Sequence, residues 1–326
     1  MSNLFGSKLR VTIFGSSHSE GVGATIEGLP AGISLTADLF SDDIERRRPT
    51  KVGETRRTES DTVTLLGVDA ETHCTTGDRV TLHFQNSNIR SSDYSQFEEH
   101  PRPSHADLVQ KRKYGESYNL AGGGIASGRM TLPLVAVGVI AKQLLPNTRF
   151  STRVVSVGGE SDPDRIASLI EEARLTGDSL GGIVECRATG VPALLGEPFF
   201  DSAESIISHL LFSIPAVKGV EFGDGFSGTL KRGSERNDAI IDAEGHTATN
   251  NEGGINGGIT NGNDLVVRVA IKPTASISRP QNTYNFSHAA IEPLTITGRH
   301  DVCIARRAAV VVEAMVALAL AELSMR

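Results

Sequence analysis

The sequence predicts one mixed α/β domain, spanning residues 1–326, that is not a doubly wound parallel sheet. Strand-like and helix-like segments alternate only loosely along the chain. No Pro/Ser-rich linker, charge block or internal repeat divides it. The first strand candidate runs into residues 15–23, which lack the G-x-G-x-x-G pattern of a dinucleotide-binding turn. Hydrophobic residues make up 39% and charged residues 22%, as in a globular protein.

The first half of the chain contains four candidate elements, over residues 9–14, 36–48, 80–84 and 132–145. The first and third are strand candidates. The second is expected to be a helix with Thr36 as N-cap and Pro49 as its end. The fourth is an apolar stretch that predicts a buried helix. Residues 102–131 are rich in Gly, His, Arg and Lys without apolar periodicity, so loops are expected there.

The second half contains five candidate elements, over residues 163–176, 181–188, 201–212, 265–271 and 306–323. Pro163 suits the first turn of a helix and Gly177 its end. Asp201 is expected to cap the next helix. The clean alternation of Leu265 to Ile271 predicts a strand. The final segment predicts a long helix.

Composition narrows the class of function. A net charge of −7, 5% aromatic residues and no Trp argue against nucleic acid as a partner. The longest apolar stretches, 132–141 and 308–321, are too short to span a bilayer, and no secretory signal is visible. Three widely spaced cysteines fit a reducing compartment and argue against a metal site. A cytoplasmic protein without a membrane or metal partner is therefore expected.

Seven segments carry side chains suited to anion binding or proton transfer. They are Gly15 to His18, Glu45 to Arg48, Arg57 with Glu59 and Asp61, Arg102 to Asp107, Ala121 to Arg129, Lys272 to Ser276, and Gly298 to Asp301. Each also has an ordinary interpretation: a turn, a solvated helix end, the exposed face of a strand, or a surface loop. For Arg57, Glu59 and Asp61 the exposed strand face is the preferred interpretation. Together the segments predict a cleft for a polyanion and a phosphate-bearing cofactor, with His as proton carrier.

Two of these segments allow a sharper prediction. Three consecutive arginines fan over about 200° of a helix, so at least one of Arg46, Arg47 and Arg48 is expected to point inward. A buried arginine requires an anionic partner. Asp107, two residues after His105, is placed to orient that imidazole.

The same segments, together with Lys113-Tyr114-Gly115 and Ala216 to Glu221, resemble the chorismate synthase family. The matches occur in order and span nearly the whole chain. The resemblance implies a β-α-β sandwich with helices between antiparallel sheets, and a homotetramer. It implies a lyase that uses reduced FMN to eliminate phosphate from 5-enolpyruvylshikimate 3-phosphate in a 1,4-anti sense, giving chorismate, in aromatic amino acid biosynthesis. Whether the chain also reduces its flavin with NADP(H) stays open.

The resemblance also implies roles for individual residues. His18 and His105 would handle protons, and Asp301 would tune the flavin. The substrate-binding residues would be Ser17, Arg47, Arg102, Arg129 and Arg299. The residues lining the FMN would be Ile125, Ala126, Ser127, Pro215, Ala216, Gly257, Lys272, Pro273, Thr274, Ala275, Ser276 and Arg299.

The chain departs from the family pattern at the glycine loop. Ala121 and Ile125 stand where the family carries arginine, and Ser16 and Met130 where it carries glutamate. These losses motivate two alternatives: a non-catalytic paralogue that keeps FMN, or a flavin-dependent phosphate lyase acting on a related cyclic acid. The retained histidines and arginines favour the lyase over the paralogue.

Overall fold

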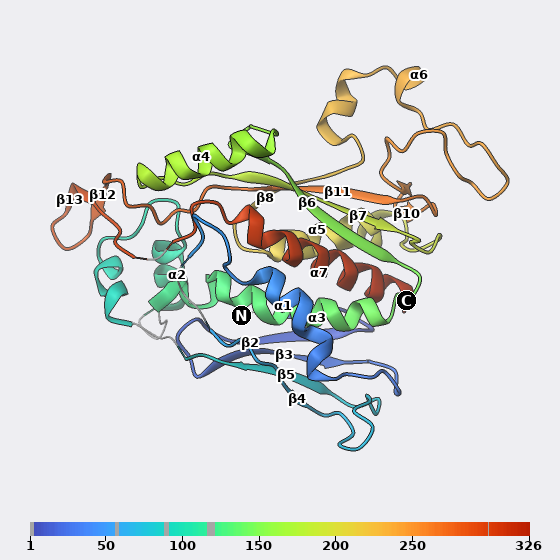
Figure 1. Ribbon diagram of the computed structural model, residues 1–326, viewed down its shortest axis with the longest axis horizontal. Helices are drawn as coiled ribbons and strands as arrows, with labels where there is room; N and C mark the ends of the chain where they lie inside the picture. Colours follow the sequence, from blue (N-terminus) through green and yellow to red (C-terminus); the bar gives the residue numbers. More distant parts are fainter. Residues whose placement is uncertain (1–2, 56–58, 88–90, 116–120, 299) are drawn as a thin grey trace.

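Two antiparallel sheets enclose two layers of helices (Figure 1). The structure is a computed structural model, and it describes residues 3–55, 59–87, 91–115, 121–298 and 300–326. The architecture confirms the predicted sandwich with helices between antiparallel sheets.

The first sheet is built from the N-terminal part of the chain. Its strand order is β1-β2-β3-β5-β4, all antiparallel, with bounds β1 (Leu4–Phe5), β2 (Arg10–Gly15), β3 (Gly21–Glu27), β4 (Thr64–Leu66) and β5 (Val80–Gln85). Alternate residues of β5, including Leu82 and Phe84, are fully buried, while those between them are partly exposed. One face of the sheet therefore packs on the helices.

The second sheet comes from the C-terminal half. Its order is β6-β7-β11-β8, again antiparallel, with bounds β6 (Arg149–Val157), β7 (Gly182–Thr189), β8 (Val217–Phe222) and β11 (Leu265–Ile271). The predicted alternation of β11 is observed, since Val267 and Val269 are fully buried and Arg268 is partly exposed.

Four helices fill the space between the sheets: α1 (Ser41–Arg47), α3 (Thr131–Gln143), α5 (Ala203–Ser213) and α7 (Ala305–Ser324). α3 packs against β3 and β5, α7 packs against β6 and β7, and the two helices pack on each other. Gly138 permits that contact, because a Cβ atom there would overlap Ala314. The stretch Ala121–Gln143 is long and apolar enough for a membrane span, but 72% of it is buried inside the protein, as a core helix would be.

A buried ion cluster joins three of these helices. Glu313 of α7 accepts hydrogen bonds from Arg46 of α1 (2.7 and 2.9 Å) and from Lys142 of α3 (2.5 Å). Burial raises the pKa of Glu313, but the hydrogen bond from Arg46 and the charge of Lys142 outweigh it and lower the pKa to about 2.

The structure describes thirteen further elements. They are η1 (Ala37–Phe40), η2 (Ser91–Glu98), α2 (Asp107–Tyr114), η4 (Ala121–Ala126), η5 (Gly128–Met130), α4 (Pro163–Leu175), η6 (Phe199–Asp201), η7 (Gly225–Leu230), α6 (Gly233–Arg236), β9 (Ile255–Asn256), β10 (Ile259–Thr260), β12 (Gln281–Asn285) and β13 (Ala290–Leu294). Residues 224–252, which include η7 and α6, form an arm that projects from the body (Figure 1).

Three local predictions were wrong. Thr36 does not cap with its side chain, because the chain first forms the 3-10 turn η1 and α1 begins only at Ser41. Asp201 does not cap α5; Ser202 does, accepting from the Ser205 N–H (3.0 Å), while Asp201 pairs with Arg326. The region 102–131 contains α2, whose polar, basic composition hid the helix.

Candidate active site

One cavity of about 960 Å³ opens where the loops of both sheets meet the ends of the central helices. Its walls come from the loop after β2, the end of α1, residues 102–106, the glycine loop of η4, the end of α5, residues 272–276 and the start of α7. Seven Arg or Lys and four carboxylates are among the described residues that line it. A chain of net charge −7 therefore concentrates cations here, which suits an anionic ligand.

His105 is oriented by a buried carboxylate. Its Nδ1 lies 2.7 Å from Asp107 Oδ1 and 3.1 Å from Arg102 Nη2. An ionised carboxylate can only accept, so the 2.7 Å contact requires an Nδ1–H group on His105 that donates to Asp107. Arg102 holds Asp107 with two further bonds of 2.8 Å. Burial raises the pKa of Asp107, but these donors hold it well below its usual range. Nε2 of His105 lies on the Gly123 side of the ring, 3.7 Å from where a Cβ atom on that glycine would be.

His18 packs against the glycine loop. Gly122, Gly123 and Gly124 all have positive φ (62°, 84° and 55°), which other residues adopt with strain. A Cβ atom on Gly122 would overlap the His18 ring and Ser17 Oγ, and a Cβ atom on Gly123 would lie 3.7 Å from the His105 ring. Two consecutive glycines therefore lie against the two imidazoles.

Three guanidinium groups of the lining lie close to one another. Arg129 pairs with the buried Asp61, and Arg47 lies 3.6 Å from the same carboxylate. Arg307 donates to the Arg47 carbonyl (2.9 Å) and to Asp301 (2.9 Å). Burial, followed by repulsion from Arg307, lowers the pKa of Arg47 to about 9, so the group stays charged at pH 7. Three cations share two carboxylates, which leaves room for an anion.

The chorismate synthase family model matches residues 9–325 of the chain. A chorismate synthase of Chitinophaga pinensis is 50% identical over 321 residues, covering 98% of this chain and 96% of that protein. One from Korarchaeum cryptofilum is 40% identical, covering 99% and 98%.

The chain belongs to the chorismate synthase family. A crystal structure of a chorismate synthase superposes with a TM-score of 0.74 at 27% identity, covering 98% of this chain and 92% of that one. The chain is thus a member of an enzyme family of carbon–oxygen lyases acting on phosphates.

The cavity brings together most of the residues that the resemblance singled out. Those that line it are His18, Arg47, Arg102, His105, Ile125, Ala126, Ser127, Arg129, Pro215, Ala216, Lys272, Pro273, Thr274, Ala275, Ser276 and Asp301. Ser17 is fully buried behind His18, against Gly122. Arg299 and Arg57 lie outside the described residues.

Gly257 is not among the residues that line the cavity. It sits between β9 and β10, next to Gly258, whose carbonyl accepts from the Ala203 N–H at the start of α5. The cavity touches the other end of α5, at Phe212 and Ser213. Eleven residues of helix, about 15 Å, separate the two places. Within one chain, Gly257 and the cavity are therefore apart.

The cavity fits a chorismate synthase flavin in several respects. Ile125, Ala126, Pro215 and Ala216 offer apolar surface for an aromatic ring. Thr274 Oγ1 is buried without a hydrogen-bond partner, as expected of a hydroxyl that meets a ligand. Burial and the neighbouring Lys218 lower the pKa of Lys272, an unfavourable proximity that a phosphate would relieve.

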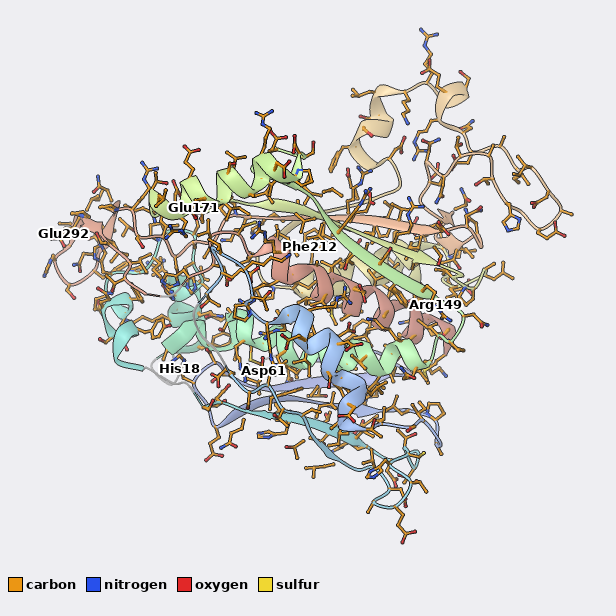
Figure 2. All side chains as sticks on the ribbon, in the orientation of Figure 1. His18, Asp61, Arg149, Glu171, Phe212 and Glu292 are labelled. Carbon is orange, nitrogen blue, oxygen red and sulfur yellow. The ribbon has the colours of Figure 1, made fainter. Side chains whose placement is uncertain are left out.

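The structure corrects one interpretation and adds lining residues to which the sequence analysis assigned no role. Asp61 is not on an exposed strand face; it is buried, has φ of 49°, and holds Arg129. Lys218, Arg307 and His300 also line the cavity. Arg307 lies in a predicted helix, where a solvated charge is the usual expectation. Its position at the first turn of an otherwise apolar helix was the available signal. Figure 2 labels His18, Asp61 and Phe212, three residues of the lining from distant parts of the chain.

Proposed function

We propose that the chain catalyses the reduced-FMN-dependent 1,4-anti elimination of phosphate from 5-enolpyruvylshikimate 3-phosphate, giving chorismate in the shikimate pathway. One observation carries this proposal. The rings of His18 and His105 both lie against the same glycine loop, in a cavity whose lining has more cations than carboxylates. Membership of the chorismate synthase family supports it.

The arginines bind the anionic substrate. Arg47 is 4% exposed and Arg129 7% exposed, so their charges act in a medium that screens weakly. Guanidinium groups match the geometry of both phosphate and carboxylate. Because Asp61 and Asp301 offset only part of the charge of Arg47, Arg129 and Arg307, an incoming dianion is attracted and held. Fixed cations also stabilise the charge that grows on phosphate as its C–O bond breaks.

His105 moves a proton near the departing phosphate. Its Nδ1–H donates to Asp107, so Nε2 is the atom available to the ligand. The Asp107 carboxylate stabilises the ring when it gains a second proton, as an orienting carboxylate does in other acid–base pairs. Arg102 and Ser276 hold this pair in place from the cavity wall.

His18 is proposed to deliver a proton on the flavin side of the site. Its ring is wedged between Gly122 and the edge of Tyr94, with ring centres 5.4 Å apart. This packing holds the imidazole of His18 in one orientation. A fixed imidazole favours proton transfer at one position.

Residues on two sides of the cavity are proposed to hold FMN. Ser127 and Ala126 would contact it at the start of α3, and residues 272–276 would hold its phosphate. When bound, the reduced ring supplies electron density that stabilises positive charge developing on the substrate, without net oxidation. The protein contributes position, exclusion of water and the fixed charges.

The test is an anaerobic assay with reduced FMN and 5-enolpyruvylshikimate 3-phosphate, following chorismate and phosphate together. The lyase proposal requires both products in equal amounts, dependent on reduced FMN. Folded protein that binds FMN but releases neither product would instead support the non-catalytic paralogue. The reason to test this alternative is Ile125, an apolar residue of the cavity wall where the family carries arginine. Turnover of only another phosphorylated cyclic acid would support the related lyase.

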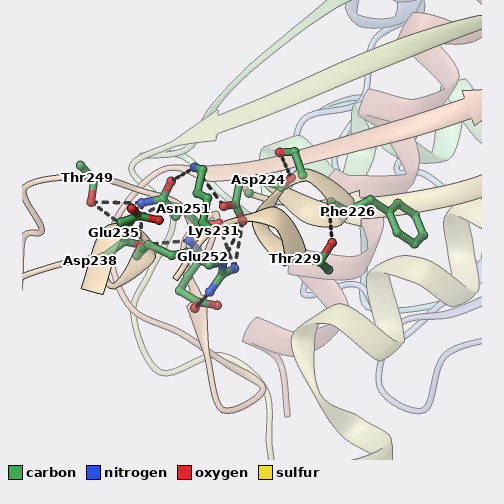
Figure 3. A network of polar contacts seen from close by, with 12 residues as sticks. Asp224, Phe226, Thr229, Lys231, Glu235, Asp238, Thr249, Asn251 and Glu252 are labelled. Atoms are coloured by element: carbon green, nitrogen blue, oxygen red, sulfur yellow. Dashed lines mark hydrogen bonds and ion pairs between the residues drawn. The ribbon is translucent and has the colours of Figure 1, made fainter. Parts of the chain in front are cut away.

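We further propose a cytoplasmic homotetramer on the strength of the family resemblance. Large apolar side chains exposed on the arm, Phe226, Leu230, Ile240 and Ile241, support an assembled state, since such patches commonly mark protein contacts. The arm is internally ordered by ion pairs, including Arg236 with Asp224 and Glu252 (Figure 3). Light scattering of the purified protein tests the tetramer, and NADPH-supported turnover under oxygen tests flavin reduction by the chain itself.

A further inference from the structure

His300 occupies the cavity wall in a constrained position. It lies in the loop between β13 and α7, and it is partly exposed. The ring passes Gly298, whose φ is 144°; a Cβ atom there would lie 3.0 Å from His300 Nε2. A side chain at 298 would therefore be strained and would crowd the ring. The two buried residues Leu294 and Ile296, packed on Phe97, anchor the loop on the strand side.

One ring nitrogen of His300 has no partner among the described residues. Nε2 is buried and makes no hydrogen bond to any of them. The ring does bond to the Thr297 backbone, and this bond raises the pKa of His300, so it joins the ring N–H to the Thr297 carbonyl. The hydrogen therefore sits on Nδ1, and Nε2 carries a lone pair. Burial first, and then the charge of Arg102, lower the pKa of His300 to about 4, which leaves the ring neutral at pH 7.

The neighbouring groups do not satisfy this lone pair. Arg102 directs its donors to Asp107 and Ser276. Asp301 accepts from the Thr55 N–H (3.0 Å) and from Arg307. A buried acceptor without a partner is rare in folded proteins and commonly marks a ligand contact. Since the described neighbours leave this acceptor unpaired, a group that enters the cavity can supply its partner.

We propose that His300 Nε2 accepts a hydrogen bond from an N–H or O–H group of the bound ligand, which makes His300 a specificity-determining residue. The cavity is otherwise rich in donors, so this atom selects for a ligand that carries a donor at the matching position. The inference rests on the proposed function, which supplies two such donors: the imide N–H of the flavin ring and the free hydroxyl of the substrate ring.

The experiment compares His300→Phe, which removes the acceptor, with His300→Gln, which offers an amide oxygen in its place. Dissociation constants for reduced FMN and for 5-enolpyruvylshikimate 3-phosphate are measured anaerobically by calorimetry. His300→Phe is expected to weaken one ligand about tenfold, the equivalent of one net hydrogen bond, and His300→Gln to recover most of the loss. His288→Phe, at an exposed site paired with Glu292, is the matched control and should leave both constants unchanged.

The two sources of the donor give different results. If the flavin imide donates, N3-methylated FMN binds wild type about tenfold more weakly than FMN, and His300→Phe no longer distinguishes the two. If the substrate hydroxyl donates, only the substrate constant rises in His300→Phe. A folded His300→Phe variant that binds both ligands within twofold of wild type would overturn the inference.

Failure of the proposed function is separable from failure of this inference. Wild-type protein that binds reduced FMN and the substrate but forms no chorismate contradicts the lyase. The ratio of dissociation constants between His300→Phe and wild type still decides the role of His300, because it does not depend on turnover.

Discussion

Replacing Asp107 with Asn tests whether this carboxylate acts through His105. The substitution keeps the shape of the side chain but removes the charge that pairs with His105 Nδ1 at 2.7 Å and with Arg102 at 2.8 Å. Two effects are expected. The imidazolium form of His105 loses its stabilising partner, and Arg102, only 5% exposed, loses its counter-charge.

The magnitudes follow from these contacts. General acid–base catalysis contributes about 10²–10⁴-fold, so turnover of Asp107→Asn should fall within that range. Breaking a buried ion pair by removing one partner costs about 3–5 kcal/mol of folding stability. Asp178→Asn is the matched control, because Asp178 pairs with Arg279 on the exposed surface, where such pairs contribute up to about 1 kcal/mol.

The assay combines single-turnover kinetics with urea unfolding. Asp107→Asn in a His105→Ala background separates positioning from a direct role, because a residue that acts through His105 has little further effect once His105 is gone. A folded Asp107→Asn enzyme with wild-type turnover would refute the reasoning. So would an undiminished loss in the His105→Ala background.

Three further predictions follow from the geometry. Gly122→Ala should abolish most activity, because the added Cβ atom displaces His18. Gly115→Ala is the control: its φ is also positive but the space around it is open, so only backbone strain is expected. Turnover and melting temperature separate the two effects. Inorganic phosphate should stabilise the protein, by about 2.7 kcal/mol at a hundred times its dissociation constant, and Arg47→Met should remove most of that gain in a thermal shift assay. Glu313→Gln should lower the free energy of unfolding by about 1.5–3 kcal/mol, the contribution of a hydrogen bond to a charged group, because Arg46 and Lys142 keep Asp43 as a partner. Since the pKa of Glu313 is lowered to about 2, its contribution is full above the unfolded value of about 4.3 and is lost as pH falls toward 2, so acid titration of unfolding should be shallower in the variant.

The sequence predicted elements best where packing imposes a period on one segment. β11 and α4 followed their patterns because each buries one face. α4 also has the predicted Pro163 in its first turn, after Asp162, whose side chain accepts from the Asp164 N–H (2.9 Å). α2 escaped notice because it buries only Asp107 and shows no apolar stripe. Asp61 was misread because its burial depends on Arg47 and Arg129, which are distant in sequence.

In the site, too, contacts between residues distant in sequence could not be predicted. An inward arginine was predicted from the fan of three, and Arg47 is indeed buried. Its partners could not be derived locally, since Thr131 and Asp61 reach it only through the packing of α3 and the first sheet. Gly257, which the resemblance assigned to the flavin, lies near the start of α5, away from the cavity of the same chain, so that assignment stays a prediction.

The position of the cations explains why the cavity can be both buried and charged. Arg46, whose side chain is partly exposed, pairs with the buried Glu313, and this pairing stabilises the helix layers. Arg47, the next residue, points about 100° away on α1 and meets Asp61 only at 3.6 Å, beside two other guanidinium groups. Adjacent residues of one helix thus separate two tasks. The pair of Arg46 and Glu313 holds the helices together. Arg47, whose charge is only partly offset by Asp61, attracts an anion. A carboxylate introduced at Thr131 would give Arg47 a full counter-charge, as Glu313 gives Arg46. This change should leave stability intact and weaken phosphate binding.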